Sequence, residues 1–258
     1  MHETERLNEV FKQKMTAPVA VTTHDEKSVN EGICWLVGHL GEGQRLTVWT
    51  PQKQNLTGDP QLRSLVARTS VEHITGRGGA HLAGSGPVLM AWPRPADISE
   101  FLRYNSHQVT ALCVIAWGDE LLSWVSSARP ELLGKTTAWD MGDQLDPVVE
   151  AAMRNVTESI NHNNTITGGY EKDDVVSALL ALHDAGYALD AKALEGWAVA
   201  NGWSGRNPAH LADYARKIMS GSRPRSKRKR DTNFVERMRQ ETSSSICLLY
   251  TSPSPRDR

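Results

Sequence analysis

The sequence predicts an α/β fold, with a Rossmann-like, mostly parallel sheet in the first half and a helical C-terminal subdomain in the second. Short β-rich runs alternate with segments of helical period between residues 24 and 130, which is the pattern of βα units. Two of the runs, 87–92 and 109–117, are almost continuously apolar, as strands covered on both faces are. From residue 145 onward, apolar residues recur at helical spacing only.

The elements of the first half are bounded by apolar spacing and by stop signals. Gly41 ends the first helix, and Pro51 ends the first strand. Asp59 is followed by Pro60, which is an N-cap with proline at the first helical position. We therefore predict strands over 45–50, 71–75, 87–92 and 109–117, and helices over 26–40, after Asp59, after Pro95 and over 119–128.

The second half carries repeated helix start signals. Asp146 and Pro147 repeat the N-cap followed by proline, and Asp190 and Asn207 open later helices. Gly186 ends one of these helices, as glycine commonly does just past a helix C-terminus. We therefore predict a subdomain of packed helices.

These patterns divide the chain into five segments, although they do not predict the strand order. We expect an N-terminal extension (1–23), a Rossmann-like α/β domain (24–130), a linker (131–144), a helical subdomain (145–220) and a disordered basic tail (221–258).

Charge is distributed very unevenly along the chain. The formal net charge is −1, but residues 216–258 carry +8 and residues 1–215 carry −9. A dense basic cluster attracts phosphate polyanions, while the alternative interpretation is a solvated, disordered tail. The candidate nucleic-acid-binding residues of this cluster are Arg223, Arg225, Lys227, Arg228, Lys229 and Arg230.

The end of the chain has an unusual sequence. Residues 247–257 (CLLYTSPSPRD) resemble the conceptual translation of a transposon-end adapter used in sequencing libraries. We expect the reading frame to pass from natural sequence into adapter before this point. The alternative is a genuine Ser/Pro-rich flexible tail, and both interpretations predict no fold there.

Several classes of protein are excluded by composition. No run of about 18 apolar residues exists, which excludes a membrane-spanning helix. The N-terminus lacks a basic segment followed by an apolar stretch, so we expect no signal peptide and a cytoplasmic location. Three widely spaced cysteines exclude a disulfide framework and a cysteine-rich metal site. No histidine pattern typical of a metal site appears, and no cofactor is identified.

The first candidate for phosphate binding is the glycine-rich loop 76–86, where Arg77 adds positive charge. Backbone amides in such a turn can approach a phosphate closely. However, the loop leads into a strand at Pro87, whereas the Walker and dinucleotide fingerprints lead into a helix. The alternative interpretation is a mobile connection.

The second candidate is the segment after the first predicted strand. Ligands of open α/β sheets bind beyond the carboxyl ends of the strands, and Lys53 and Asn55 follow such an end. The alternative is a structural loop, because Asp59 already places a negative charge at the next helix start.

The third candidate is Asp119, which follows the strongest strand. Carboxylates at strand ends serve metal-dependent phosphoryl chemistry. Asp119 is also well placed as the N-cap of the next helix, and we favour that structural role.

Three tryptophans, Trp49, Trp92 and Trp117, end predicted strands. On parallel strands they would gather at one rim of the sheet, where they could form a floor for a base or ring. The alternative is that they pack the sheet against its helices.

Residues 194–214 show a family resemblance. Leu194, Trp197 and Ala198, followed by Gly205-Arg206, are similar to the two-helix DNA-binding domain of Lsr2-type nucleoid proteins. The resemblance implies that Arg206 contacts the minor groove of DNA, although Ser204 stands where that family has a second arginine. The chain as a whole resembles uncharacterised actinobacterial α/β proteins.

These observations favour a soluble binding protein whose ligand is a nucleotide or nucleic acid. Its candidate ligand-binding residues are Lys53, Asn55, Arg77 and Asp119, with Arg206 and the basic cluster as nucleic-acid contacts. The first alternative is a small-molecule enzyme with its site at the carboxyl ends of the strands, using Asp119, His81 or Ser85. The second is a protein-interaction adaptor without a ligand.

Overall fold

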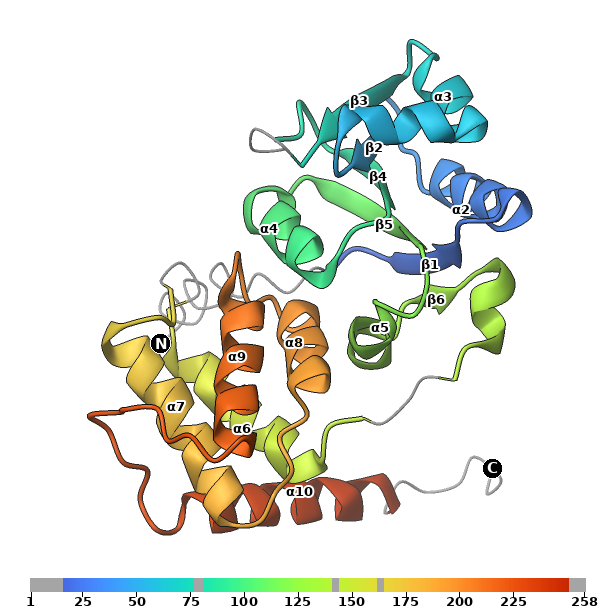
Figure 1. Cartoon of the computed structure of the whole chain (residues 1–258). Helices are drawn as coiled ribbons and strands as arrows, with labels where there is room; N and C mark the ends of the chain where they lie inside the picture. Colours follow the sequence, from blue (N-terminus) through green and yellow to red (C-terminus); the bar gives the residue numbers. More distant parts are fainter. Residues whose placement is uncertain (1–15, 77–80, 141–143, 162–164, 251–258) are drawn as a thin grey trace, which may run out of the picture. The chain divides into compact units, whose positions relative to one another are not determined.

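The structure is a computed structural model that describes residues 16–76, 81–140, 144–161 and 165–250. The chain forms two compact units, each with its own core (Figure 1). The sheet unit comprises residues 1–144 and 195–209, and the helical unit comprises residues 145–194 and 210–258. No helix within the described ranges is both long enough and apolar enough to cross a membrane.

The sheet unit contains a six-stranded sheet in which every pairing is parallel, which confirms the predicted α/β class. The strand order is β3-β2-β4-β5-β1-β6. The strands are β1 (Val19–Thr23), β2 (Leu46–Thr50), β3 (Val71–Thr75), β4 (Gly86–Ala91), β5 (Val109–Ala116) and β6 (Glu131–Leu132).

Helices cover both faces of the sheet. Alternate side chains of a strand point to opposite faces, so each central strand contributes to two cores. On β5, Leu112 and Val114 pack with α4 (Pro95–Asn105) and α5 (Leu122–Ala128). Cys113 and Ile115 belong to the second core, with α2 (Glu26–Gly38) and α3 (Pro60–Val66). Burial on both faces explains why the central strands read as continuous apolar runs.

The predicted helix starts are confirmed at several N-caps. Asp59 accepts a hydrogen bond from the Leu62 amide at 2.9 Å, and Pro60 occupies the first turn of α3. The N-cap role of Asp119 is wrong. Helix α5 begins three residues later than position 119, at Leu122, and Asp119 contributes only its backbone carbonyl, which accepts from the Leu122 amide at 3.1 Å. The intervening residues turn sharply before the helix begins.

Two short strands lie in segments where the sequence predicted none. The segment 1–23, expected as an extension, contains β1, which pairs with β5 on one side and β6 on the other. The segment 131–144, expected as a linker, contains β6 and the 3-10 helix η2 (Gly134–Ala138). Neither strand has enough residues to show a period, and both become strands because β5 and β1 supply their hydrogen-bonding partners.

Glycine permits one close backbone approach in the sheet unit. A Cβ atom at Gly196 would lie 2.3 Å from the carbonyl carbon of Ser123, so α8 (Ala191–Ala200) packs against α5 with no side chain between the two backbones. The buried Val199 of α8 joins the same core as α4 and α5.

The helical unit is built from α6 (Pro147–Ser159), α7 (Gly169–Asp184), the part of α9 (Asn207–Met219) from residue 210, and α10 (Phe234–Tyr250). Asp146 caps α6 by accepting from the Val148 amide at 2.8 Å, as the sequence predicts. The fully buried apolar residues include Met153 and Val156 of α6 and Leu179 and Leu182 of α7.

The segment 221–258 differs from the disordered tail that the sequence predicts. Residues 222–230 are attached to α7 without forming a helix or a strand, and α10 follows them. Phe234 and Met238, one turn apart on α10, are buried, and α10 lies against α6 and α7. The adapter-like residues 247–250 form the last turn of α10, and 251–257 lie outside the described residues.

Candidate functional site

The basic cluster of the sequence lies in residues 222–230 of the helical unit, here called the basic strap. The strap is fastened to α7 at several points along its length (Figure 1). Arg223 donates two hydrogen bonds to the Asp184 carboxylate, at 2.8 and 2.7 Å, near the end of α7. The Ser226 hydroxyl donates to the Asp173 carbonyl at 3.0 Å. The strap is therefore part of the fold of this unit.

The main fastening point is the carboxylate of Asp174, which is fully buried. Arg228 Nη1 lies 2.5 Å from its Oδ1, and Arg230 Nη2 lies 2.9 Å from its Oδ2. The Ser159 hydroxyl also donates to this carboxylate. A buried carboxylate is tolerated when it is paired and its oxygens accept hydrogen bonds, and both conditions are met here.

Aromatic rings hold the same two arginines. The Arg228 guanidinium lies 4.5 Å from the centre of the Tyr170 ring, and Arg230 lies 4.7 Å from the Phe234 ring. A hydrogen bond from Arg228 to the Tyr170 hydroxyl raises the pKa of Arg228 above its ordinary value. Both guanidinium charges are therefore paired within the helical unit, and only 14% of the Arg230 side chain is exposed.

Three cations of the strap, Arg225, Lys227 and Lys229, make no such contact. All three are exposed, and no ion pair involves them within the described part of the chain. They form a row at every second position of the sequence, and Arg225 and Lys229 line one cavity together with Arg228 and Arg230.

A basic cavity of about 490 Å³ adjoins one end of this row. Lys172 of α7, Lys217 of α9 and Arg225 of the strap contribute its free cations. Tyr214 lines the same cavity, and its hydroxyl donates to the Ile166 carbonyl at 2.9 Å. None of the lining residues is acidic; they are Thr167, Lys172, Tyr214, Lys217, Ser222, Arg223, Pro224 and Arg225.

Arg206, which the family resemblance selects, belongs to the sheet unit. It is exposed, but the loop before it packs against α4, because the Ser99 hydroxyl donates to the carbonyls of Trp203 (2.6 Å) and Gly205 (3.1 Å). Gly205 has a φ of +61° and is buried in this loop. The Gly-Arg turn is thus anchored to α4 through its backbone.

Two of the candidate residues after β2 have different environments. Lys53 is the first residue of the 3-10 helix η1 (Lys53–Gly58) and lines a cavity of about 640 Å³ together with Arg63. Asn55 uses its side-chain oxygen to accept from the Gln52 amide at 2.8 Å, so it stabilises the turn. Arg77 lies outside the described residues.

The structure also places His73 near Lys53, a relationship that the sequence pattern does not reveal. His73 Nε2 lies 2.9 Å from Thr50 Oγ1, at the carboxyl end of β2. Burial, and next the positive charge of Lys53, lower the pKa of His73.

The three residues proposed for an enzyme, His81, Ser85 and Asp119, make no contact with one another that the structure records. The His81 ring lies 5.4 Å from the Tyr104 ring, in an edge arrangement. Asp119 and Ser85 are exposed. Within the described ranges, no three His, Cys, Asp or Glu side chains are grouped so that they could hold a metal ion.

The predicted tryptophan rim forms in part. Trp92 and Trp117 meet edge-on with ring centres 6.1 Å apart, just beyond β4 and β5. Trp49 is 2% exposed and packs into the core instead, because it precedes the last residue of β2. His24, beyond β1, stacks on Trp117 with ring centres 4.7 Å apart. No sequence signal identifies His24, because the sequence does not predict β1.

Comparison with known proteins gives one match. Residues 145–241 match the model of a domain of unknown function, DUF1889. This range begins at the first residue of the helical unit and includes the whole basic strap. No curated protein and no solved structure matches the chain.

Proposed function

We propose that the helical unit binds nucleic acid through its phosphate backbone, with the unpaired cations of the basic strap and the adjoining cavity as the contact surface. The observation that carries the proposal is the division of the strap cations into two sets. Arg223, Arg228 and Arg230 are neutralised by Asp184 and Asp174. Arg225, Lys227 and Lys229 have no such partner in the described structure and are exposed.

The arrangement favours a polyanion over a single small anion. A row of three exposed cations at every second position suits a repeating charge, and the cavity with Lys172 and Lys217 extends the row. Cations that neutralise phosphates release condensed counterions, which supplies most of the sequence-independent affinity for nucleic acid. The fixed strap also needs little ordering when it binds, because α7 already holds it.

The negative charge of the rest of the chain limits how many phosphates can contact the protein. Residues 1–215 carry a net charge of −9, so nucleic acid is repelled from most of the remaining surface. Phosphate contacts position a protein but do not read bases. We therefore expect weak preference for sequence and a contact of three to five phosphates.

The test is fluorescence polarisation of the full chain with a labelled 20-base-pair duplex over a range of salt concentrations. For three to five phosphate contacts, the logarithm of the binding constant should fall with the logarithm of salt with a slope of about −3 to −4.5. The triple variant Arg225→Ala/Lys227→Ala/Lys229→Ala should reduce that slope by about 2.7.

The matched control removes three exposed cations from the sheet unit, as Lys27→Ala/Arg45→Ala/Arg129→Ala. It should leave the slope unchanged. Equal losses in the two triple variants, or no salt-dependent binding by the unmodified chain at low salt, would overturn the proposal.

A further inference from the structure

An aromatic cluster stands at the carboxyl edge of the three neighbouring strands β4, β5 and β1. It consists of Trp92, Trp117 and His24, each just beyond the end of its strand. The Trp117 side chain is 64% exposed, and the His24 ring is stacked on it with an angle of 21° between the planes. The carboxyl edge is where parallel α/β sheets bind their ligands.

Trp92 has two features that packing alone does not explain. Its φ is 55°, in the left-handed region that a bulky residue rarely adopts. Its indole Nε1 is buried and has no hydrogen-bond partner in the described structure. Strained residues gather at ligand-binding and catalytic sites, and buried donors are nearly always paired. Both features distinguish Trp92, which packs against the second core, from an ordinary core residue.

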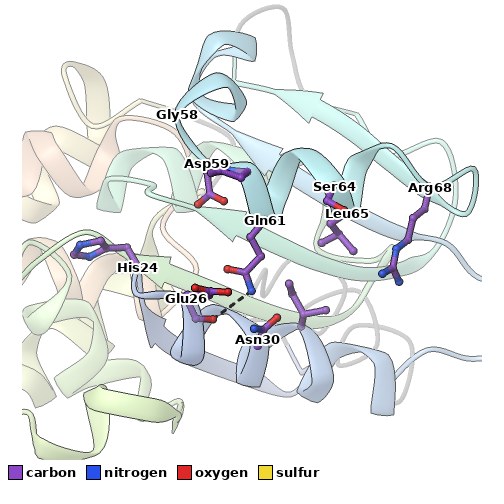
Figure 2. Close-up of a pocket in the computed structure, with 11 residues that line it drawn as sticks. His24, Glu26, Asn30, Gly58, Asp59, Gln61, Ser64, Leu65 and Arg68 are labelled. Carbon is purple, nitrogen blue, oxygen red and sulfur yellow. Dashed lines mark hydrogen bonds between the residues drawn. The ribbon is translucent and has the colours of Figure 1, made fainter.

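A cavity of about 610 Å³ adjoins the cluster, between α2 and α3 (Figure 2). His24 lies at one end of it and Arg68 at the other. Ile33 and Leu65 give it an apolar part, and hydrogen-bonding side chains surround that part. The Gln61 side chain donates to the Glu26 carbonyl at 3.2 Å and joins the two walls.

At the His24 end of this cavity the charges disfavour a phosphate group, whereas the cation Arg68 lies at the opposite end. Asp25 caps α2 by accepting from the Ser28 amide, and Asp59 caps α3 in the same way. Hydrogen bonds from Thr23 and Ser28 hold the pKa of Asp25 far below its ordinary value, so its negative charge persists. The carboxylate of Glu26 also lines the cavity. The amide dipoles that would attract a phosphate therefore already face carboxylates.

We propose that this cavity binds an unphosphorylated nucleoside whose base carries an exocyclic amino group. At the His24 end of the cavity, the base extends the stack that His24 forms with Trp117. The amino group donates to the Glu26 carboxylate, and Asn30 and Ser64 offer further donors and acceptors. This site lies wholly in the sheet unit and is independent of nucleic-acid binding by the strap.

The test is isothermal titration of the full chain with cytidine, uridine and cytidine monophosphate. Uridine has a carbonyl oxygen where cytidine has the amino group, and this oxygen and the Glu26 carboxylate are both acceptors that repel each other. We therefore expect cytidine to bind at least about tenfold more tightly. The monophosphate should bind more weakly than cytidine. Absence of cytidine binding at millimolar concentration, or tighter binding of the monophosphate, would overturn the proposal.

Variants localise the site. His24→Ala should weaken cytidine binding about tenfold or more through the lost stacking, while His24→Phe should retain it. Glu26→Gln should abolish the preference for cytidine over uridine. The matched control is Glu31→Gln on the same helix, outside the cavity, which should change nothing. If the two glutamate variants behave alike, the assignment of Glu26 is wrong. The strap triple variant should bind cytidine normally, so this proposal and the proposed function can fail separately.

Discussion

Arg230 and Asp174 form an ion pair 56 positions apart in the chain, with 2.9 Å between Nη2 and Oδ2. The carboxylate of Asp174 is fully buried, and Arg228 approaches it from the strap as well. This pair is what converts a basic cluster into an ordered strap, because it holds the strap on α7 while Arg225, Lys227 and Lys229 stay exposed.

Removal of the Asp174 carboxylate should destabilise the helical unit and release the strap. Asp174→Ala leaves Arg230 largely buried without a counter-charge, and breaking a buried pair in this way costs about 3 kcal/mol or more. Chemical denaturation measures the loss. The control is Asp173→Asn at the neighbouring position, where the backbone carbonyl, not the side chain, accepts from Ser226. A loss below about 1 kcal/mol for Asp174→Ala would contradict the central role of this pair.

Replacement of Gly86 should destabilise the sheet unit. A Cβ atom at this position would lie 2.2 Å from the Arg45 carbonyl oxygen, which is backbone and cannot turn aside. Gly86→Ala should therefore cost about 2 kcal/mol or more, as overpacking does. Gly84→Ala, two residues earlier, meets no atom within 4 Å and should be nearly neutral. Thermal unfolding of the two variants side by side tests the difference.

Stability should depend on pH through Asp25. Hydrogen bonds from Thr23 and Ser28 lower its pKa in the folded state, so its contribution is present above the ordinary value near 3.8 and is lost as pH falls below it. The melting temperatures of the unmodified chain and Asp25→Asn should therefore differ at pH 6 and converge only as the pH falls below about 4.

Lys135 provides the internal comparison for that prediction. It lies 3.5 Å from Asp25, but its charge contributes less to the shift than the hydrogen bonds do. The convergence should persist in Lys135→Ala. A difference between the unmodified chain and Asp25→Asn that stays constant with pH would show that Asp25 is not preferentially stabilised as a carboxylate.

The elements predictable from sequence are those whose signals are local. The apolar runs of β4 and β5 and the caps Asp59 and Asp146 identify their elements because each signal lies within the element itself. Strand β1 is not predicted because its strand conformation depends on pairing with β5, 93 positions away in the chain.

In the candidate sites, too, local features are predictable from sequence, whereas contacts between distant segments are not. The basic cluster is plain in the sequence, but the division between paired and unpaired cations depends on Asp174 and Asp184, which belong to a different helix. The tryptophan rim was predicted from strand ends, yet Trp49 faces the core because it stands one residue before its strand ends. His24 depends on β1 and carries no local signal.

Cysteine reactivity should differ sharply between two positions of α2 and β5. Cys34 is exposed on α2, whereas Cys113 is fully buried in β5, and burial raises the pKa of its thiol to about 12. Since the thiolate is the reactive form, iodoacetamide at pH 8 should alkylate Cys34 within minutes and spare Cys113 in the folded chain. Peptide mapping by mass spectrometry follows each site, and denaturant should make Cys113 react as readily as Cys34.

Because a Cβ at Gly32 would lie 2.9 Å from the Cys113 sulfur, Gly32→Ala should loosen this packing and accelerate alkylation of Cys113. Equal rates at the two cysteines in the folded chain would mean that α2 does not cover β5.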